Sequence, residues 1–341
     1  MEILIDTSTD EYYSNEINNE PILDVKNARF CLYPIVYTGL WNLYKKQQSL
    51  FWKAEEVDFS EDYKDWEKLN SDEKDVIKMI LAFFANTDGI VNLNISSRLL
   101  NQITINEAKV TYNFQMMIEN IHSEVYTLML DNLIKDKNEK EHLFNSITTI
   151  PSIKKISDWA LKWINDETHI ANRIVAFACI EGIMFSGAFA TIFWLKKHKG
   201  AGKLFMNGLI KSNEFISRDE GLHAEFACEL FKLIVNKPNK NDIINIITES
   251  VEIASEFIND SIKCRLVGLN SELMNQYIKY VADRLIVSLG YDKYYKVINP
   301  FSFMDTIGMV QKTNFHEQRV TEYQSAYNSN TSREFTNSED F

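Results

Sequence analysis

Glycine and proline are scarce in this sequence, which has 11 Gly and 5 Pro among 341 residues. The two residues together make up about 12% of an average soluble protein. A sandwich or barrel of short strands needs many tight turns, and such turns depend on Gly and Pro. The scarcity therefore disfavours a turn-rich β fold and favours long helices with few connections. Hydrophobic residues make up 45% of the chain, which is enough for a substantial soluble core.

Paired cysteines and excess positive charge are also missing. The cysteines form no Cys-x-x-Cys motif, which disfavours a disulfide framework or a zinc site and suits reduced thiols in a cytoplasmic protein. A net charge of −12 and a pI near 5.1 leave no electrostatic footprint for nucleic acid or an anionic membrane surface. No basic segment followed by a long apolar run begins the chain, so we expect no signal peptide. The cysteines are Cys31, Cys179, Cys228 and Cys264.

One long apolar run, Ile174 to Leu195, has the composition of a membrane span and a single charged residue, Glu181. We interpret it as a helix buried inside a soluble bundle, because we identify no second span and the flanking helices carry many charges. Glu181 then lies in the middle of an apolar helix, where a carboxylate needs a partner.

The hydrophobic periodicity divides the chain into three parts. Residues 1–29 are polar and acidic and are expected to form an N-terminal arm, whereas 30–316 carry helical periodicity and form the main domain. The pattern fades in 317–341, where Phe335 and Phe341 stand among acidic residues; such a tail is either flexible or a docking peptide. The expected helices span about 33–54, 70–101, 104–135, 152–166, 169–198, 203–235, 240–265 and 271–289.

Three Glu-x-x-His motifs occur, and their surroundings differ. Glu139 and His142 lie among Lys, Asp and Asn residues, which indicates a solvated surface pair without function. Glu119 and His122 lie in an apolar helical stretch and, at 100° per residue, fall within about 60° of Tyr126. The same face can thus bury an acid, an imidazole and a phenol, although a structural Glu–His hydrogen bond and an ordinary core tyrosine would give the same pattern.

Glu220 and His223 repeat this arrangement on a second helix, with Ile216 on the same face. Asp88 and Glu181 are lone carboxylates in two further apolar helices, and each alone could be a capped or salt-bridged acid. Together, one acid from each of two helices and a Glu-x-x-His pair from each of two others match the ligand set of di-iron and di-manganese carboxylate bundles. We therefore predict an all-α, ferritin-like bundle with additional helices and a di-metal site in its core.

The charges of this set are balanced, because four carboxylates and two neutral imidazoles neutralise two divalent cations. Oxygen and imidazole ligands without thiolate favour iron or manganese over zinc or copper. The spacing of the ligands does not choose between iron and manganese.

Over most of its length the sequence resembles the small, radical-generating subunit of class I ribonucleotide reductase, in its eukaryotic and viral branch. The resemblance rests on five motifs: Ala-Asn-Thr-Asp-Gly-Ile-Val at 85–91, Glu-Asn-Ile-His-Ser-Glu-Val-Tyr at 119–126, Val-Ala-Phe-Ala-Cys-Ile-Glu-Gly-Ile-Met-Phe-Ser-Gly at 175–187, Ile-Ser-Arg-Asp-Glu-Gly-Leu-His at 216–223 and Asn-Pro-Phe-Ser-Phe-Met at 299–304.

The resemblance implies roles for individual residues. Two iron ions per chain, with manganese as the alternative, would activate O₂ and leave a stable radical on Tyr126, inside an apolar shell. The implied metal ligands are Asp88, Glu119, His122, Glu181, Glu220 and His223, and the implied shell residues are Phe185, Phe189 and Ile216.

The resemblance also implies a partner. The radical would pass to a large subunit, where ribonucleotides are reduced to deoxyribonucleotides, along a route that begins at Trp41 and Asp219. In that route the Asp bridges the Trp to His122. Tyr323, with Tyr327 as the alternative, would relay the radical in the tail, and Phe335 to Phe341 would dock to the large subunit. A homodimer is implied as well, and the absence of a Gly-rich phosphate loop fits a chain that does not itself bind the nucleotide.

Two other readings of the site are weaker. A ferritin-like iron store would use similar ligands, but such chains are about half as long and need neither Tyr126 nor the tail. A di-iron oxygenase or desaturase needs a substrate channel to the metals, where this sequence has the bulky Phe185 and Phe189.

Overall fold

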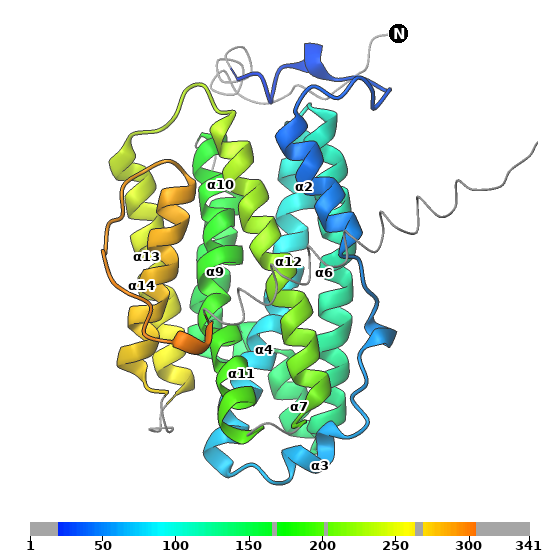
Figure 1. Ribbon diagram of the computed structural model, residues 1–341, viewed down its shortest axis with the longest axis vertical. Coiled ribbons are helices and arrows are strands. Elements are labelled where there is room, and N and C mark those ends of the chain that lie inside the picture. Colours follow the sequence, from blue (N-terminus) through cyan, green and yellow to red (C-terminus); the bar gives the residue numbers. More distant parts are fainter. Residues whose placement is uncertain (1–19, 166–168, 201–203, 263–268, 305–341) are drawn as a thin grey trace, which may run out of the picture. The chain divides into compact units, whose positions relative to one another are not determined.

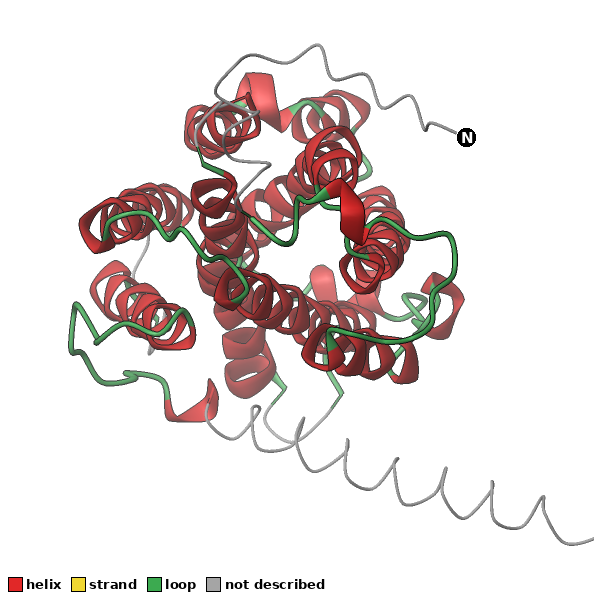
Figure 2. Cartoon of the chain, turned by 90° about the horizontal axis from the view of Figure 1, so that it is seen from above, coloured by secondary structure: helices red, strands yellow, loops and turns green. Residues whose placement is uncertain are grey.

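The computed structural model describes residues 20–165, 169–200, 204–262 and 269–304. The chain forms two compact units, Met1–Pro300 and Phe301–Phe341, and only the first is described over most of its length. Its elements are all helical, which confirms the predicted fold class (Figure 2). The predicted limits of the arm and the tail stay predictions, and Tyr323, Tyr327 and Phe335 to Phe341 lie outside the described residues.

Nine helices of ten or more residues form the described part of the first unit, and shorter helical turns connect them (Figure 1). The long helices are α2 (Thr38–Ser49), α4 (Ser71–Asn94), α6 (Asn106–Leu133), α9 (Pro151–Asn165), α10 (Ile170–Cys179), α11 (Ser186–Lys199), α12 (Asn207–Lys232), α13 (Lys240–Ser261) and α14 (Ser271–Ser288). The shorter ones are η1 (Val25–Asn27), η2 (Ala54–Glu56), α3 (Asp62–Trp66), η3 (Ile95–Leu99), α5 (Leu100–Gln102), α7 (Lys137–Phe144), α8 (Ser146–Thr149) and η4 (Ile180–Met184).

Four helical segments surround the centre of the bundle: α4, α6, the run from α10 through η4 to α11, and α12. α4 packs along α6, and α12 packs along α10 and α11. α2 lies against α6 and α12, and the pair α13 and α14 covers the far side of α10 and η4 (Figure 1). These four segments are the ones that carry the predicted metal ligands.

Local sequence explains where several helices begin. Asn70 accepts a hydrogen bond from the Glu73 amide and Glu73 accepts one from the Asn70 amide, so α4 begins with a capping box. Asn270 caps α14 in a similar way through the amide of Leu273. The helix predicted over 33–54 is shorter in the structure, where α2 spans Thr38–Ser49. Pro34 disfavours helical geometry at the residue before it, Tyr33.

The apolar run around Glu181 belongs to a continuous helical stretch, Ile170–Lys199, whose most apolar window is 89% buried inside the protein. A second stretch, Ser71–Gln102, is also long and apolar enough to cross a membrane, so the sequence-based statement that only one such segment exists was wrong. Both stretches line the centre of the bundle, where an apolar helix surface packs against other helices.

Residues 20–28, at the end of the predicted arm, lie against the helices. Buried Glu20 accepts hydrogen bonds from the amides of Val235 and Asn236, at 2.9 and 2.6 Å. The carbonyl of Ile22 accepts hydrogen bonds from both the amide and the hydroxyl of Thr104. This segment is therefore held at two distant points of the bundle.

Candidate metal centre

Four helical segments bring the six predicted ligands together. Each of the six side chains is at most 2% exposed. Two groups of donor atoms form, and within each group the atoms lie within 4.8 Å of one another; Glu119 belongs to both groups. The groups are Glu119, Glu181, Glu220 and His223, and Asp88, Glu119 and His122.

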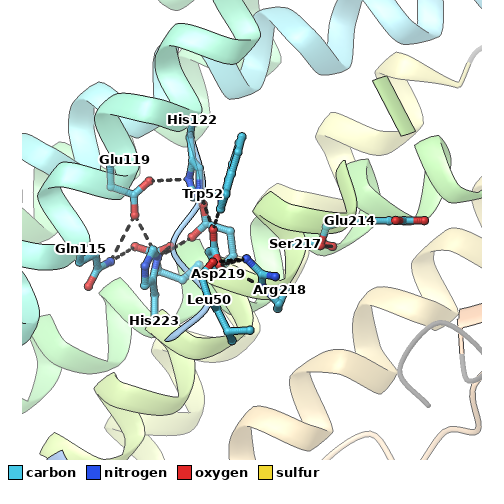
Figure 3. A network of polar contacts seen from close by, with 12 residues as sticks. Leu50, Trp52, Gln115, Glu119, His122, Glu214, Ser217, Arg218, Asp219 and His223 are labelled. Carbon is cyan, nitrogen blue, oxygen red and sulfur yellow. Dashed lines mark hydrogen bonds and ion pairs between the residues drawn. The ribbon is translucent and has the colours of Figure 1, made fainter. Parts of the chain in front are cut away.

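Both imidazoles turn Nδ1 toward carboxylates of the two Glu-x-x-His helices (Figure 3). Nδ1 of His122 lies 3.1 Å from Oε2 of Glu119 and 3.1 Å from Oε1 of Glu220. Nδ1 of His223 lies 3.0 Å from Oε1 of Glu119 and 3.0 Å from Oε2 of Glu220. The i, i+3 spacing on α6 and α12 thus brings two carboxylates and two imidazoles into contact with one another in the core.

This concentration of buried acid is unfavourable without cations. Burial, together with the charges of Glu119 and Glu220, raises the pKa of Asp88 well above its ordinary value. Burial and the same two acids also raise the pKa of Glu181. Both oxygens of Asp88 and Oε2 of Glu181 lack hydrogen-bond partners among the described residues. Such orphaned, buried acceptors are costly, and two divalent cations would satisfy them, so the residues fit a di-metal centre.

The same buried carboxylates also shift the pKa values of the two histidines. Burial by itself would lower the pKa of His122, but hydrogen bonding to Asp219, Glu119 and Glu220 outweighs it and raises that pKa. Burial is likewise outweighed at His223, where the charge and hydrogen bond of Glu119 contribute most to raising the pKa. Both shifts reflect the excess of buried carboxylate charge around the two rings.

Glu181 lies in η4, a π-helical turn that interrupts the helix between α10 and α11. The sequence pattern predicted an uninterrupted α-helix from 169 to 198 and did not indicate this turn. A π turn contains an extra residue, which shifts the following side chains around the helix axis, and such turns are frequent at functional sites.

Gln115 is a site residue that the sequence analysis missed. Its side chain is fully buried one turn before Glu119 on α6. Its Nε2 donates to Oε1 of Glu181 at 2.9 Å and reaches Oε1 of Glu119 at 3.4 Å (Figure 3). The amide therefore links ligands from two helices. The available signal was an amide in an apolar stretch on the same helical face as Glu119.

Tyr126 lies one turn after His122 and is 2% exposed. Burial raises the pKa of its phenol well above the ordinary value, and the charge of Asp88 adds to the rise. Among the described residues its hydroxyl has no hydrogen-bond partner. The ring of Phe84, which the sequence analysis did not single out, stacks on the ring of Tyr126.

The predicted shell residues are all buried near the centre of the bundle. Phe185 and Phe189 both contact Phe84, at centroid distances of 5.6 and 4.9 Å, and so belong to one aromatic cluster with Tyr126. Ile216 is fully buried on α12, one turn before Glu220.

The predicted contact between Trp41 and Asp219 is wrong, because a different tryptophan makes it. Nε1 of Trp52 donates to Oδ2 of Asp219 at 2.7 Å, and this oxygen lies 3.3 Å from Nε2 of His122. Trp41 is partly exposed and packs against Tyr44. The sequence pattern predicted a helix that continues to residue 54, whereas α2 ends at Ser49. The loop that follows α2 brings Trp52 to His122, on which its ring stacks.

The third Glu-x-x-His motif lies on the surface, on α7. Glu139 accepts a hydrogen bond from Lys78, and His142 is exposed. Neither residue joins the buried ligand groups.

Comparison with known proteins gives the family. The chain matches "Ribonucleotide reductase, small chain" over residues 29–300. It is 52% identical over 305 residues to the ribonucleoside-diphosphate reductase small chain of vaccinia virus (strain Ankara), covering 89% of this chain and 94% of that protein. It is 53% identical over 308 residues to a ribonucleoside-diphosphate reductase small chain of Arabidopsis thaliana, covering 90% of this chain and 91% of that protein.

A solved structure, the Rnr4 homodimer of the Saccharomyces cerevisiae ribonucleotide reductase, has a TM-score of 0.78 and 35% identity and covers 92% of this chain and 96% of that chain. These matches confirm the resemblance inferred from the five motifs. The chain therefore belongs to the ribonucleotide reductase small chains, the small subunits of ribonucleoside-diphosphate reductase, and carries the buried di-metal carboxylate site in its helical core.

Proposed function

We propose that the six buried ligands hold two iron ions and that Tyr126 carries a stable radical, which this subunit generates for a large subunit. The observation that carries this proposal is the Tyr126 phenol, which is buried within the electrostatic reach of Asp88 and has no hydrogen-bond partner for its hydroxyl among the described residues. When bound, the metal pair supplies the electrons that reduce O₂ and the oxidising power to take one more from the phenol.

The protein's part is to hold the ligands and to isolate the phenol. Asp88, Glu119 and His122 form one group of donors, and the second group shares Glu119 with Glu181, Glu220 and His223. The high pKa of Tyr126 keeps the phenol protonated, so its oxidation must release a proton together with the electron. The surrounding phenylalanine rings exclude water and small reductants, which favours a long-lived radical.

The contacts of Asp219 support a route for the radical. Its Oδ2 joins Trp52 to His122, while Arg218 donates to its Oδ1 at 3.1 and 3.2 Å. The guanidinium holds the carboxylate in place between the other two groups (Figure 3). We assign to Trp52 the role that the sequence analysis gave to Trp41.

The remaining assignments extend this proposal to the tail and the assembly. Tyr323, or alternatively Tyr327, would relay the radical, and Phe335 to Phe341 would dock to the large subunit. A homodimer is supported by the yeast relative, whose solved structure is described as one. The donor set accepts manganese as well as iron, and metal analysis of the purified protein distinguishes the two.

The proposal is tested by adding iron(II) and oxygen to the metal-free protein and recording its electron paramagnetic resonance (EPR) spectrum. We expect an organic radical in the wild type and none in Tyr126→Phe, which should still bind two metal ions per chain because it keeps all six ligands. Tyr112→Phe is the matched control, since Tyr112 is a buried tyrosine of the same helix. A radical that persists unchanged in Tyr126→Phe would refute the assignment.

The docking role is tested with a chain that lacks residues 335–341. This deletion should leave the radical signal intact and abolish ribonucleotide reduction with the large subunit, because the six proposed metal ligands all lie between Asp88 and His223. Full reductase activity of the shortened chain would exclude the docking role.

A further inference from the structure

We propose that Phe84 is a positioning residue for Tyr126, which fixes the plane of the phenol ring and closes one of its faces. This inference rests on the proposed function, in which Tyr126 carries the radical. The two rings come from neighbouring helices, Phe84 from α4 and Tyr126 from α6. Their centroids lie 4.7 Å apart and their planes differ by 9°, which is the geometry of an offset parallel stack.

Among the described residues, no protein group orients Tyr126 through its hydroxyl. A buried tyrosine usually has a hydrogen-bond partner for its hydroxyl, and this one has none among the described residues. A phenol without that anchor can rotate about its Cβ–Cγ bond unless packing against its faces prevents it. The parallel ring of Phe84 supplies such packing over one face.

Phe84 is itself held in place by other rings. It is 1% exposed and stacks on Phe189, at a centroid distance of 4.9 Å and an angle of 26°. Phe185 meets it edge-on at 5.6 Å, and the neighbouring Phe83 lies at 5.5 Å. These three aromatic contacts fix the plane of the Phe84 ring. The parallel stack then fixes the plane of the Tyr126 ring.

The ring plane matters to a phenoxyl radical for a physical reason. Unpaired spin on the ring couples to the two Cβ protons, and each coupling depends on the angle between its C–H bond and the ring plane. A ring with one fixed orientation gives one set of couplings, whereas a ring with several orientations gives a broadened spectrum. A covered face also keeps small reductants from the carbon atoms that carry spin.

The first test replaces Phe84 by Leu, which keeps the site apolar but removes the flat ring. Phe231→Leu is the matched control, because Phe231 is equally buried and its ring packs against Tyr291 rather than against Phe84 or Tyr126. We expect Phe84→Leu to show altered or broadened Cβ-proton splittings in the EPR spectrum and a radical that decays several-fold faster with a small reductant. Phe231→Leu should keep the wild-type splittings.

The second test needs neither metal nor radical. With 3-fluorotyrosine at position 126 of the metal-free protein, a ring that flips slowly gives two ¹⁹F resonances, one for each position of the fluorine. A ring that flips freely gives one averaged resonance. We expect two resonances with Phe84 present and one in Phe84→Leu, and Phe84→Met serves as the second variant if the Leu protein does not fold.

The outcomes separate this inference from the proposed function. If wild-type protein forms no radical, or if Tyr126→Phe keeps it, the proposed function fails whatever the ¹⁹F spectra show. If the radical is on Tyr126 but Phe84→Leu or Phe84→Met keeps both the wild-type splittings and the two resonances, Phe84 does not position the ring.

Discussion

At the scale of single residues, the side chains around Asp219 show how one carboxylate can serve several partners. Its Oδ2 accepts a hydrogen bond from Trp52 and faces His122, and its Oδ1 accepts from Arg218. A hydrogen bond from the Nε2 side of His122 to a carboxylate fixes the ring and leaves Nδ1 free to face the ligand carboxylates. Asp219 therefore connects the metal centre to the loop that follows α2.

The two tryptophans give a residue-scale prediction. Trp52→Phe removes the indole N–H that donates to Asp219 but keeps an aromatic ring, so the radical should still form while reductase activity with the large subunit falls to background. Trp41→Phe should retain most activity, because the contact with Asp219 belongs to Trp52. The measurement is turnover by the two-subunit enzyme, with EPR quantification of the radical in each variant. Equal activity of the two variants would contradict the assignment to Trp52.

At the scale of elements, the start of α12 is capped by another helix. Met206, just before α12, provides no side-chain cap. Instead, the buried carboxylate of Asp62, from α3, accepts two hydrogen bonds. Its Oδ1 accepts from the amide of Gly208 at 2.9 Å and its Oδ2 from the amide of Leu209 at 2.7 Å. A carboxylate at this end also offsets the helix dipole. The helix that supplies Glu220 and His223 is thus held at its first turn by a residue far away in the sequence.

The close approach at Gly208 gives an element-scale prediction. A Cβ atom there would lie 2.5 Å from Cδ1 of Phe59 and 2.7 Å from the carbonyl oxygen of Asp58. Because the second contact is with backbone, Gly208→Ala should lower the free energy of unfolding by about 1–3 kcal/mol. Denaturant unfolding of the metal-free protein measures the change.

Gly221→Ala is the matched control in the same helix, since a Cβ at Gly221 meets nothing within 4 Å. That substitution should be neutral or stabilise by roughly 0.5–1 kcal/mol, through the higher helix propensity of Ala. If Gly208→Ala proved as stable as Gly221→Ala, the proposed steric conflict would not exist.

At the scale of the whole molecule, the buried centre couples stability to pH and metal. The pKa values of Asp88 and Glu181 are raised above 3.8 and 4.5, so the folded, metal-free protein binds more protons than the unfolded chain as the pH passes through this range. The pKa values of His122 and His223 are raised above 6.5, and their stabilising contribution is lost as the pH rises through the folded-state values. Both effects make the metal-free protein less stable at higher pH.

Metal binding should reverse this trend, because the ligands must lose their protons to bind a cation. We expect the difference in Tm between protein with Mn²⁺ and metal-free protein to widen from roughly pH 6 to roughly pH 8. Differential scanning calorimetry measures it, and His142→Ala, in the surface motif, is the control that should behave like the wild type. A difference that is constant or narrows with pH would contradict the coupling.

Much of the site could be predicted from the sequence because the patterns that indicate it lie within single helices. The spacing of Glu119, His122 and Tyr126 follows from the helical repeat, and the apolar neighbours of Asp88 and Glu181 indicate burial wherever their helices pack. The same reasoning correctly placed the Glu139 motif at the surface. The metal-ligand set and the helical fold were therefore available before any tertiary contact was known.

Contacts between distant segments were not available in this way. Phe84 and Gln115 each lie one turn before a predicted ligand, but a shared helical face says only that they are buried. Which tryptophan reaches Asp219 depends on where α2 ends and how the next loop turns, and helix ends are the least certain feature of a sequence-based prediction. The sequence by itself determined the chemistry of the centre, because ligand type, spacing and burial are encoded within single helices. Only the tertiary structure decided which neighbours orient those groups, because that depends on how the helices pack.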